Sequence, residues 1–155
     1  MNFFLKEDEK IFEHTEWAAK KLIVDIFGYD ALLVGEIFGH NFLRTSRIAN
    51  KWRVIQNFQI PLNSEKFDFI SDLCPMSVAP EKIDLIVLPF VLESSDRPCE
   101  VLKEMTELLV TDGYLLLIGV ARWSFGRNKF FSKINSLTPS RSLGLFTIAD
   151  LKSKL

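Results

Sequence analysis

Two glycines beside an apolar segment could allow a ligand to lie against the protein backbone. Gly35 directly follows the apolar residues 31–34, and Gly39 comes a short distance later. Glycine has no side chain, so a loop of this kind can approach a cofactor closely. The loop lacks the G-x-G-x-x-G pattern of dinucleotide sites, and no acidic residue ends the next apolar segment to bind a ribose. Taken alone, the loop is as typical of a tight turn as of a cofactor site.

Other residues that could take part in catalysis or binding each have a plain structural explanation. His40 could act as a base, although a histidine at the start of a helix is usually structural. Glu93 is the one carboxylate placed to face a substrate, and it is equally placed to cap the helix expected from residue 97. The basic and aromatic residues 122–133 could bind an anion, but a solvated helix face is the more common explanation. The sequence shows no catalytic triad and no metal-ligand pattern, so we assign neither catalytic residues nor metal ligands.

The apolar pattern predicts short strands that alternate with helices. This alternation is typical of parallel strands joined by crossovers, and therefore of a doubly wound α/β sheet. In such a sheet, ligands bind beyond the carboxyl ends of the strands. We expect strands over residues 31–34, 52–55, 67–70, 83–88 and 114–118, and helices over residues 7–27 (ended by Gly28), 41–49, 97–110, 122–135 and 147–155.

Composition limits the class of protein and its partners. The 155 residues are 48% hydrophobic and carry a formal net charge of −1, which suits one globular domain and gives no bulk attraction to nucleic acid or anionic membranes. No segment is apolar enough to span a bilayer, and the N-terminus does not resemble a signal peptide. Cys74 and Cys99 have no paired pattern, which indicates reduced thiols. We therefore expect a cytoplasmic protein with no membrane partner.

The second half of the chain carries a recognisable series of motifs. The apolar residues 83–87 lead to Leu92-Glu93, then to Pro98, to residues 101–109 and to the segment 112–118. This series resembles the region from the fourth to the fifth strand of class I S-adenosylmethionine-dependent methyltransferases. Residues 27–124 also resemble a group of poorly characterised proteobacterial methyltransferase-like proteins. The resemblance implies a Rossmann-like, mostly parallel sheet in one domain over residues 1–155, with a leading helix (1–28) and an α/β core (29–155).

The resemblance implies S-adenosylmethionine as the cofactor. Gly35 and Gly39 would lie against its methionine part, and Glu36 would approach its amino group unless it is a solvated loop carboxylate. The acidic residue that grips the ribose in this family is absent. Gln56 or Asn57 stands near that place and could form an uncharged hydrogen bond.

The adenine side of the cofactor would meet two later loops. Asp72, with Leu73 beside it, matches the acidic position that reads the adenine amino group; a loop or helix-cap carboxylate is the equal alternative. Pro89 and Phe90 would flank the cofactor from the far side, although a phenylalanine at that position is as often part of the core.

The implied activity is methyl transfer to an unknown acceptor, most simply a small molecule. The sulfonium is already an excellent leaving group, so alignment of donor and acceptor dominates and a general base is optional. The segment 88–91 lacks the Asp/Asn-Pro-Pro-aromatic motif of relatives that methylate bases and amides, which disfavours nucleic acid as the acceptor. The alternative is a catalytically inactive protein of this fold that acts as a binding or partner subunit. A nicotinamide-dependent oxidoreductase is excluded by the absent dinucleotide pattern.

The C-terminal end is shorter than the resemblance implies. Class I methyltransferases continue with two further strands after the helix that corresponds to residues 147–155, whereas this chain stops there. The strand over residues 114–118 would then form a long apolar edge of the sheet, which favours pairing with another chain. Three explanations are open: the sequence is a fragment, it is naturally shortened, or the edge is covered by a second copy or by the chain's own last segments. We expect a covered edge, most simply in a homodimer.

Overall fold

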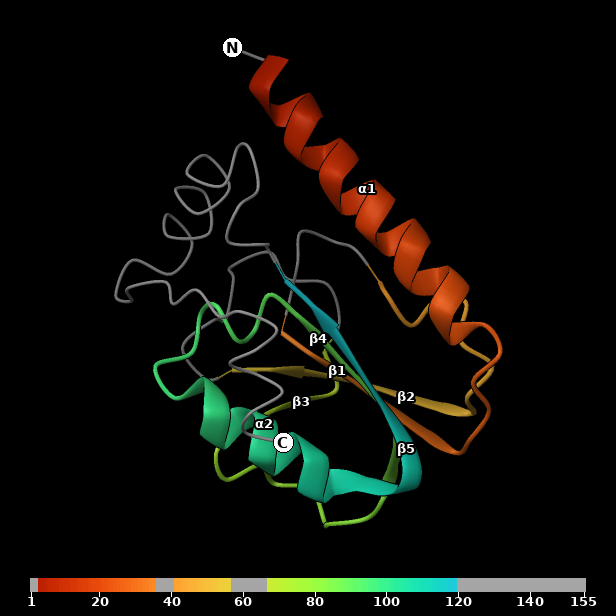
Figure 1. The fold of residues 1–155 in the computed structure, drawn as a ribbon, viewed down its shortest axis with the longest axis vertical. Helices are drawn as coiled ribbons and strands as arrows, with labels where there is room; N and C mark the ends of the chain where they lie inside the picture. Colours follow the sequence, from red (N-terminus) through yellow and green to blue (C-terminus); the bar gives the residue numbers. More distant parts are fainter. Residues whose placement is uncertain (1–2, 36–40, 57–66, 120–155) are drawn as a thin grey trace.

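The computed structural model describes residues 3–35, 41–56 and 67–119. Its strands form one five-stranded sheet in the order β3-β2-β1-β4-β5, and every neighbouring pair is parallel (Figure 1). The predicted Rossmann-like α/β sheet is thereby confirmed. The elements are α1 (Phe3–Ile23), β1 (Asp30–Val34), β2 (Asn50–Ile55), β3 (Phe69–Ile70), β4 (Ile83–Pro89), α2 (Pro98–Leu108) and β5 (Leu109–Ile118).

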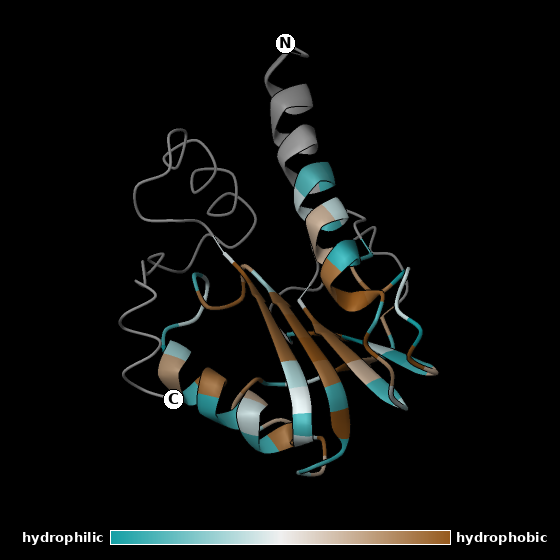
Figure 2. Ribbon diagram, turned by 45° about the vertical axis from the view of Figure 1, so that its right-hand side comes forward, coloured by the Kyte–Doolittle hydropathy of each residue, from teal (hydrophilic) through white to brown (hydrophobic). Residues whose placement is uncertain are grey.

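The centre of the sheet is formed by β1 and β4, the two most continuously apolar strands. Residues 31–34 of β1 are all buried, and Asp84 is the only residue of β4 that is not. Strands that are apolar on both faces need cover on both sides. Figure 2 shows these central strands in the hydrophobic colour.

The two described helices pack on opposite faces of the sheet, α1 through its C-terminal turns. Leu32 and Ile86 belong to the apolar cluster that includes α2, whereas Leu33 and Val87 belong to the cluster that includes Ile23 of α1. Neighbouring residues of a strand point to opposite faces, so the two helices lie on opposite sides of the sheet (Figure 1). The doubly wound arrangement predicted from the sequence is therefore present.

Two helix predictions differ from the structure. The first helix ends at Ile23 rather than at Gly28. Residues 41–49 form turns instead of a helix. The Asn41 side chain accepts a bond from the Leu43 amide, and the Ser46 hydroxyl accepts one from the Ile48 amide. Such local side-chain bonds offer the backbone an alternative to the helix.

The last described strand is also longer than predicted. β5 begins at Leu109, directly after α2, so Asp112 and Gly113 lie within the strand rather than in a separate turn. The pairing with β4 shifts register between Ile83 and Leu85, as at a β-bulge. Asp112, which has a positive φ angle, lies in the corresponding part of β5. No residue of β5 is fully buried.

A carboxylate ties two central strands together at their amino ends. One Asp84 oxygen accepts hydrogen bonds from the Tyr29 and Asp30 amides at 2.8 and 2.9 Å. A Cβ atom at Gly28 would collide with this carboxyl group. Gly28 therefore makes room for Asp84, a different role from the helix terminator that the sequence suggested.

Three sets of predictions lie outside the described residues. These are the helices over residues 122–135 and 147–155, the two strands expected to be absent from the end of the chain, and the basic segment around Arg122. In the described part of the chain, no helix is long and apolar enough to cross a membrane.

Candidate functional site

The order of the strands reverses between β1 and β4. After β1 the chain continues to β2 on one side, whereas after β4 it continues to β5 on the other side. All five strands point the same way, so the loops that follow β1 and β4 leave the same edge of the sheet and diverge there. In open α/β sheets, ligands bind at this position. The candidate site is therefore the carboxyl edge of the sheet around the ends of β1 and β4.

Gly35 is held at this edge in a conformation that favours glycine. Its φ angle is +88°, and its amide donates a 2.8 Å hydrogen bond to the Val54 carbonyl of β2. A Cβ atom at this position would lie 3.3 Å from a methyl carbon of Val91, in the loop after β4. The loops that follow β1 and β4 therefore approach each other closely at Gly35, and a larger side chain there would press on Val91.

The loop after β4 is fixed by hydrogen bonds of its own. Phe90 has a positive φ angle of 55°, and its amide donates to the Ile118 carbonyl of β5 at 2.7 Å. The Ser94 hydroxyl lies 3.2 Å from the Phe90 carbonyl and 3.1 Å from the Val91 carbonyl. Positive φ in a bulky residue stores strain that the surrounding structure must sustain, and such strain is concentrated at functional sites.

The two residues predicted to flank the cofactor from this loop are buried. Pro89 is the last residue of β4 and pairs with Ile118, and Phe90 is 6% exposed within the cluster that includes α1. Phe90 thus packs in the core, which is the alternative that the sequence left open for it. A contact of either residue with a cofactor stays a prediction.

The loop after β3 presents Asp72 to solvent. Ser71 is buried, and its hydroxyl donates to the Asp72 carbonyl at 2.8 Å and accepts a bond from the Ser77 amide. Leu73 is 4% exposed in the cluster that includes α2. No helix occurs between β3 and β4, so Asp72 does not cap one. Its exposed carboxylate is available to a ligand at the end of β3.

Glu104 of α2 anchors this loop and was not among the predicted site residues. Its carboxylate accepts a 2.8 Å hydrogen bond from the Met76 amide. Burial, and next the negative charge of Glu104, raise the pKa of the Cys74 thiol above its usual value, so the thiol stays protonated at neutral pH. The sequence did contain a signal, because Glu104 occupies the acidic position of the methyltransferase-like motif in residues 101–109.

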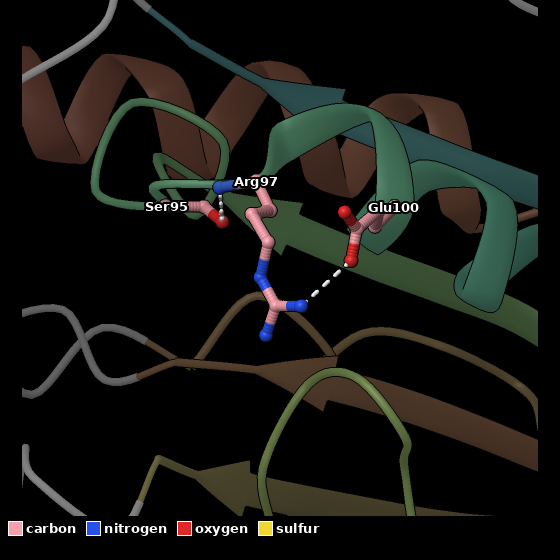
Figure 3. Close-up of polar contacts among 3 residues, drawn as sticks. All are labelled: Ser95, Arg97 and Glu100. Atoms are coloured by element: carbon pink, nitrogen blue, oxygen red, sulfur yellow. Dashed lines mark hydrogen bonds and ion pairs between the residues drawn. The ribbon is translucent and has the colours of Figure 1, made fainter.

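Glu93 does not cap the helix that follows it. α2 begins at Pro98, and no side chain caps its first turn. The nearby polar groups are satisfied within the turn: the Ser95 hydroxyl accepts the Arg97 amide at 3.2 Å, and Arg97 pairs with Glu100 at 2.9 Å (Figure 3). Glu93 is instead 7% exposed, and its carboxyl group lies against Gly119, just after β5.

The structure brings together only part of the predicted cofactor site. Gly35 lies against Val91, which follows Phe90 in the loop after β4. Asp72 follows β3 at the far side of the same edge. Gln56, one of the two candidates for the ribose, is buried. The described residues contain no group of three side chains that could bind a metal ion. The predicted residues Glu36, Gly39, His40 and Asn57 lie outside the described part of the chain.

Comparison with known proteins supports the fold. No protein family and no curated protein matches the chain. A chain from the complex of the Haloferax volcanii Trm112 methyltransferase activator with a candidate methyltransferase is 14% identical, with a TM-score of 0.67 over 96% of this chain and 69% of that one. An S-adenosylmethionine-dependent methyltransferase from Thermotoga maritima, a candidate histamine N-methyltransferase, is 17% identical, with a TM-score of 0.65 over 97% of this chain and 74% of that one.

A third similar structure is the carbon methyltransferase CurJ. It is 16% identical, with a TM-score of 0.56, and the match covers 84% of this chain and 41% of that one. At these identities the similarity concerns the fold. The chain therefore has the Rossmann-like α/β fold that S-adenosylmethionine-dependent methyltransferases also have.

Proposed function

We propose that the protein is an S-adenosylmethionine-dependent methyltransferase that acts on a small molecule. The close approach of Gly35 to Val91 carries this proposal, because it places a glycine backbone where the order of the strands reverses. The structural neighbours are methyltransferases of the same fold, which supports the cofactor. The two cysteines without a paired pattern support a cytoplasmic location.

The arrangement suits a cofactor that brings its own reactive group. A sulfonium bound at this edge would supply an activated methyl group. The protein then has to hold the donor, orient the acceptor and exclude water. We propose that Gly35 and the following residues Glu36 and Gly39 contact the methionine part, that Asn57 contacts the ribose, and that Asp72 and Leu73 contact the adenine. Pro89 and Phe90 would support the opposite side of the site from the end of β4.

Isothermal titration with S-adenosylmethionine and S-adenosylhomocysteine tests this function. We expect both to bind, and we expect Asp72→Ala to weaken binding by about 1–3 kcal/mol through the loss of one hydrogen bond to the adenine. Asp25→Ala, which removes an exposed carboxylate after α1, is the matched control and should leave the affinity unchanged. Unchanged affinity in Asp72→Ala would remove this residue from the site.

The absence of binding at millimolar ligand would contradict the enzyme function. It would favour the second candidate, a protein of this fold that acts as a binding or partner subunit. The absent ribose carboxylate supports that candidate. A methyltransferase activator is present in the complex that contains one of the structural neighbours, so assembly with a partner has a precedent in this fold.

We further propose that the protein pairs with a second copy along β5. Among the described strands, β5 stands at the end of the sheet, and Tyr114 in it is 56% exposed. An open strand edge favours pairing with another strand. We expect light scattering to give the mass of a dimer, with a Tyr114→Lys variant shifted toward the monomer. A monomer mass that does not change with protein concentration would contradict this proposal.

A further inference from the structure

The loop after β3 contains a buried serine whose hydroxyl forms two hydrogen bonds inside the loop. Ser71 is 5% exposed, and its hydroxyl donates to the Asp72 carbonyl at 2.8 Å and accepts from the Ser77 amide at 3.2 Å. The Ser71 amide donates to the Ile55 carbonyl of β2 at 3.1 Å. The hydroxyl therefore joins the two ends of the segment 71–77, and the backbone of the same residue fastens this segment to the sheet.

The bond to the Asp72 carbonyl also sets the direction of the next amide. The carbonyl of Asp72 and the N–H of Leu73 belong to one planar peptide group, and this group is trans. In a trans peptide the N–H points opposite to the carbonyl. Because the carbonyl is turned toward the Ser71 hydroxyl, the Leu73 N–H is turned away from it.

The Leu73 amide is a donor without an acceptor in the described part of the chain, although Leu73 is 4% exposed. Nearly all buried amides in native proteins are paired with protein, water or a ligand. The Asp72 carboxylate beside it is exposed, and it accepts no hydrogen bond from a described residue. An unpaired donor and an unpaired acceptor thus follow each other at the carboxyl edge of the sheet. Adenine offers the complementary pair, since its ring nitrogen N1 accepts next to an amino group that donates.

We propose that Ser71 is a positioning residue for adenine, because its hydroxyl aims the Leu73 N–H at the ring nitrogen N1. This inference rests on the proposed methyltransferase function, in which the Asp72 carboxylate accepts from the adenine amino group. Ser71 does not touch the cofactor and acts through the peptide group between residues 72 and 73. The other end of the loop is held by Glu104, which accepts the Met76 amide at 2.8 Å, so the bonds at both ends restrict this peptide group.

Isothermal titration with two ligands that differ in one ring atom tests this inference. The ligands are S-adenosylhomocysteine and its 1-deazaadenine analogue, in which a C–H group replaces N1 and cannot accept the Leu73 bond. We expect the wild type to prefer S-adenosylhomocysteine about 5-fold or more, which corresponds to one hydrogen bond. Ser71→Ala should lose most of this preference, because the peptide group is then free to turn. A role in stability alone would leave the ratio of the two affinities unchanged, since both ligands need the same folded loop.

A control variant makes the same chemical change in the same loop. Ser77→Ala removes an exposed hydroxyl but keeps the amide that donates to Ser71, so it should retain the wild-type ratio. If Ser71→Ala does not fold, Ser71→Cys replaces it, because a thiol fills a similar space but donates only weakly. We expect Ser71→Cys to show the same loss of preference.

The outcomes separate this inference from the function on which it rests. Equal affinity of the wild type for the two ligands would overturn the inference without any variant. A preference that stays unchanged in Ser71→Ala, or in Ser71→Cys where it replaces that variant, would also overturn it. No binding of S-adenosylhomocysteine to the wild type would contradict the methyltransferase function itself, and the inference would fall with it.

Discussion

Gly35→Ala is expected to lower both the stability of the protein and its affinity for S-adenosylmethionine. A residue with a side chain at a φ angle of +88° costs on the order of 1–3 kcal/mol. The new methyl group would also press on Val91 at 3.3 Å and push the loops after β1 and β4 apart. Because these loops form the proposed cofactor surface, we expect an affinity loss of about 10-fold, which corresponds to about 1.4 kcal/mol. Urea unfolding and isothermal titration measure the two effects.

The double variant Gly35→Ala with Val91→Ala separates backbone strain from the steric contact. It removes the Val91 methyl that the new Cβ would touch but leaves the unfavourable φ angle in place. We expect it to recover part of the affinity after the loss caused by Val91→Ala alone is subtracted. Wild-type stability and affinity in the single variant would show that Gly35 is only one of several residues that fit this turn.

Asp84→Ala is expected to cause the largest loss of stability among the variants considered. The substitution removes a charged acceptor from the Tyr29 and Asp30 amides, so the start of β1 loses its bonds to β4. Hydrogen bonds to a charged group contribute more than neutral ones, and we expect the free energy of unfolding to fall by about 2–4 kcal/mol. Urea denaturation measures this loss.

Asp84→Asn is the matched variant, since it keeps a side-chain oxygen of the same size and removes only the charge. We expect it to lose less stability than Asp84→Ala. Affinity for S-adenosylmethionine should stay close to that of the wild type in both folded variants, because Asp84 lies at the amino ends of the strands, away from Gly35. Equal stability of the wild type and Asp84→Ala would contradict the role assigned to this carboxylate.

The sheet could be predicted because its central strands carry strong local signals. Residues 31–34 and 83–88 are apolar on both faces, a pattern that a parallel strand between two layers of helices produces. The helix predicted from residue 97 is present and begins at Pro98, where a missing amide hydrogen has little effect. The structure confirms these elements because their pattern depends on neighbours in sequence.

Other elements could not be predicted because specific side-chain bonds, or contacts between distant residues, decide them. Residues 41–49 were expected to be helical, yet side-chain bonds of Asn41 and Ser46 hold turns that bury Phe42. Gly28 was interpreted as the end of a helix, whereas its small size serves Asp84, which is far away in the sequence. Apolar periodicity contains no information about such approaches.

The conformation of Gly35 fits its predicted place in a loop after a strand, whereas the contacts around it could not be predicted. Gly35 was identified from its position after an apolar segment, and the structure gives it the conformation and the close contact that require glycine. The two explanations of Glu93 could not be separated by sequence, because both place it between β4 and α2. The bond from the Met76 amide to Glu104 joins residues on different elements, so it became visible only in three dimensions.

The amino ends and the carboxyl ends of the strands have separate roles. The amino edge holds the Asp84 bonds that align the central strands, whereas Gly35, Glu93 and the turn after β4 occupy the opposite edge. Mutations can therefore accumulate in the loops of one edge with little effect on the framework that the other edge secures. A protein divided in this way can change the ligand that it binds over evolutionary time without having to evolve a new fold. The same division makes residues 90–94 a suitable segment for grafting a different specificity.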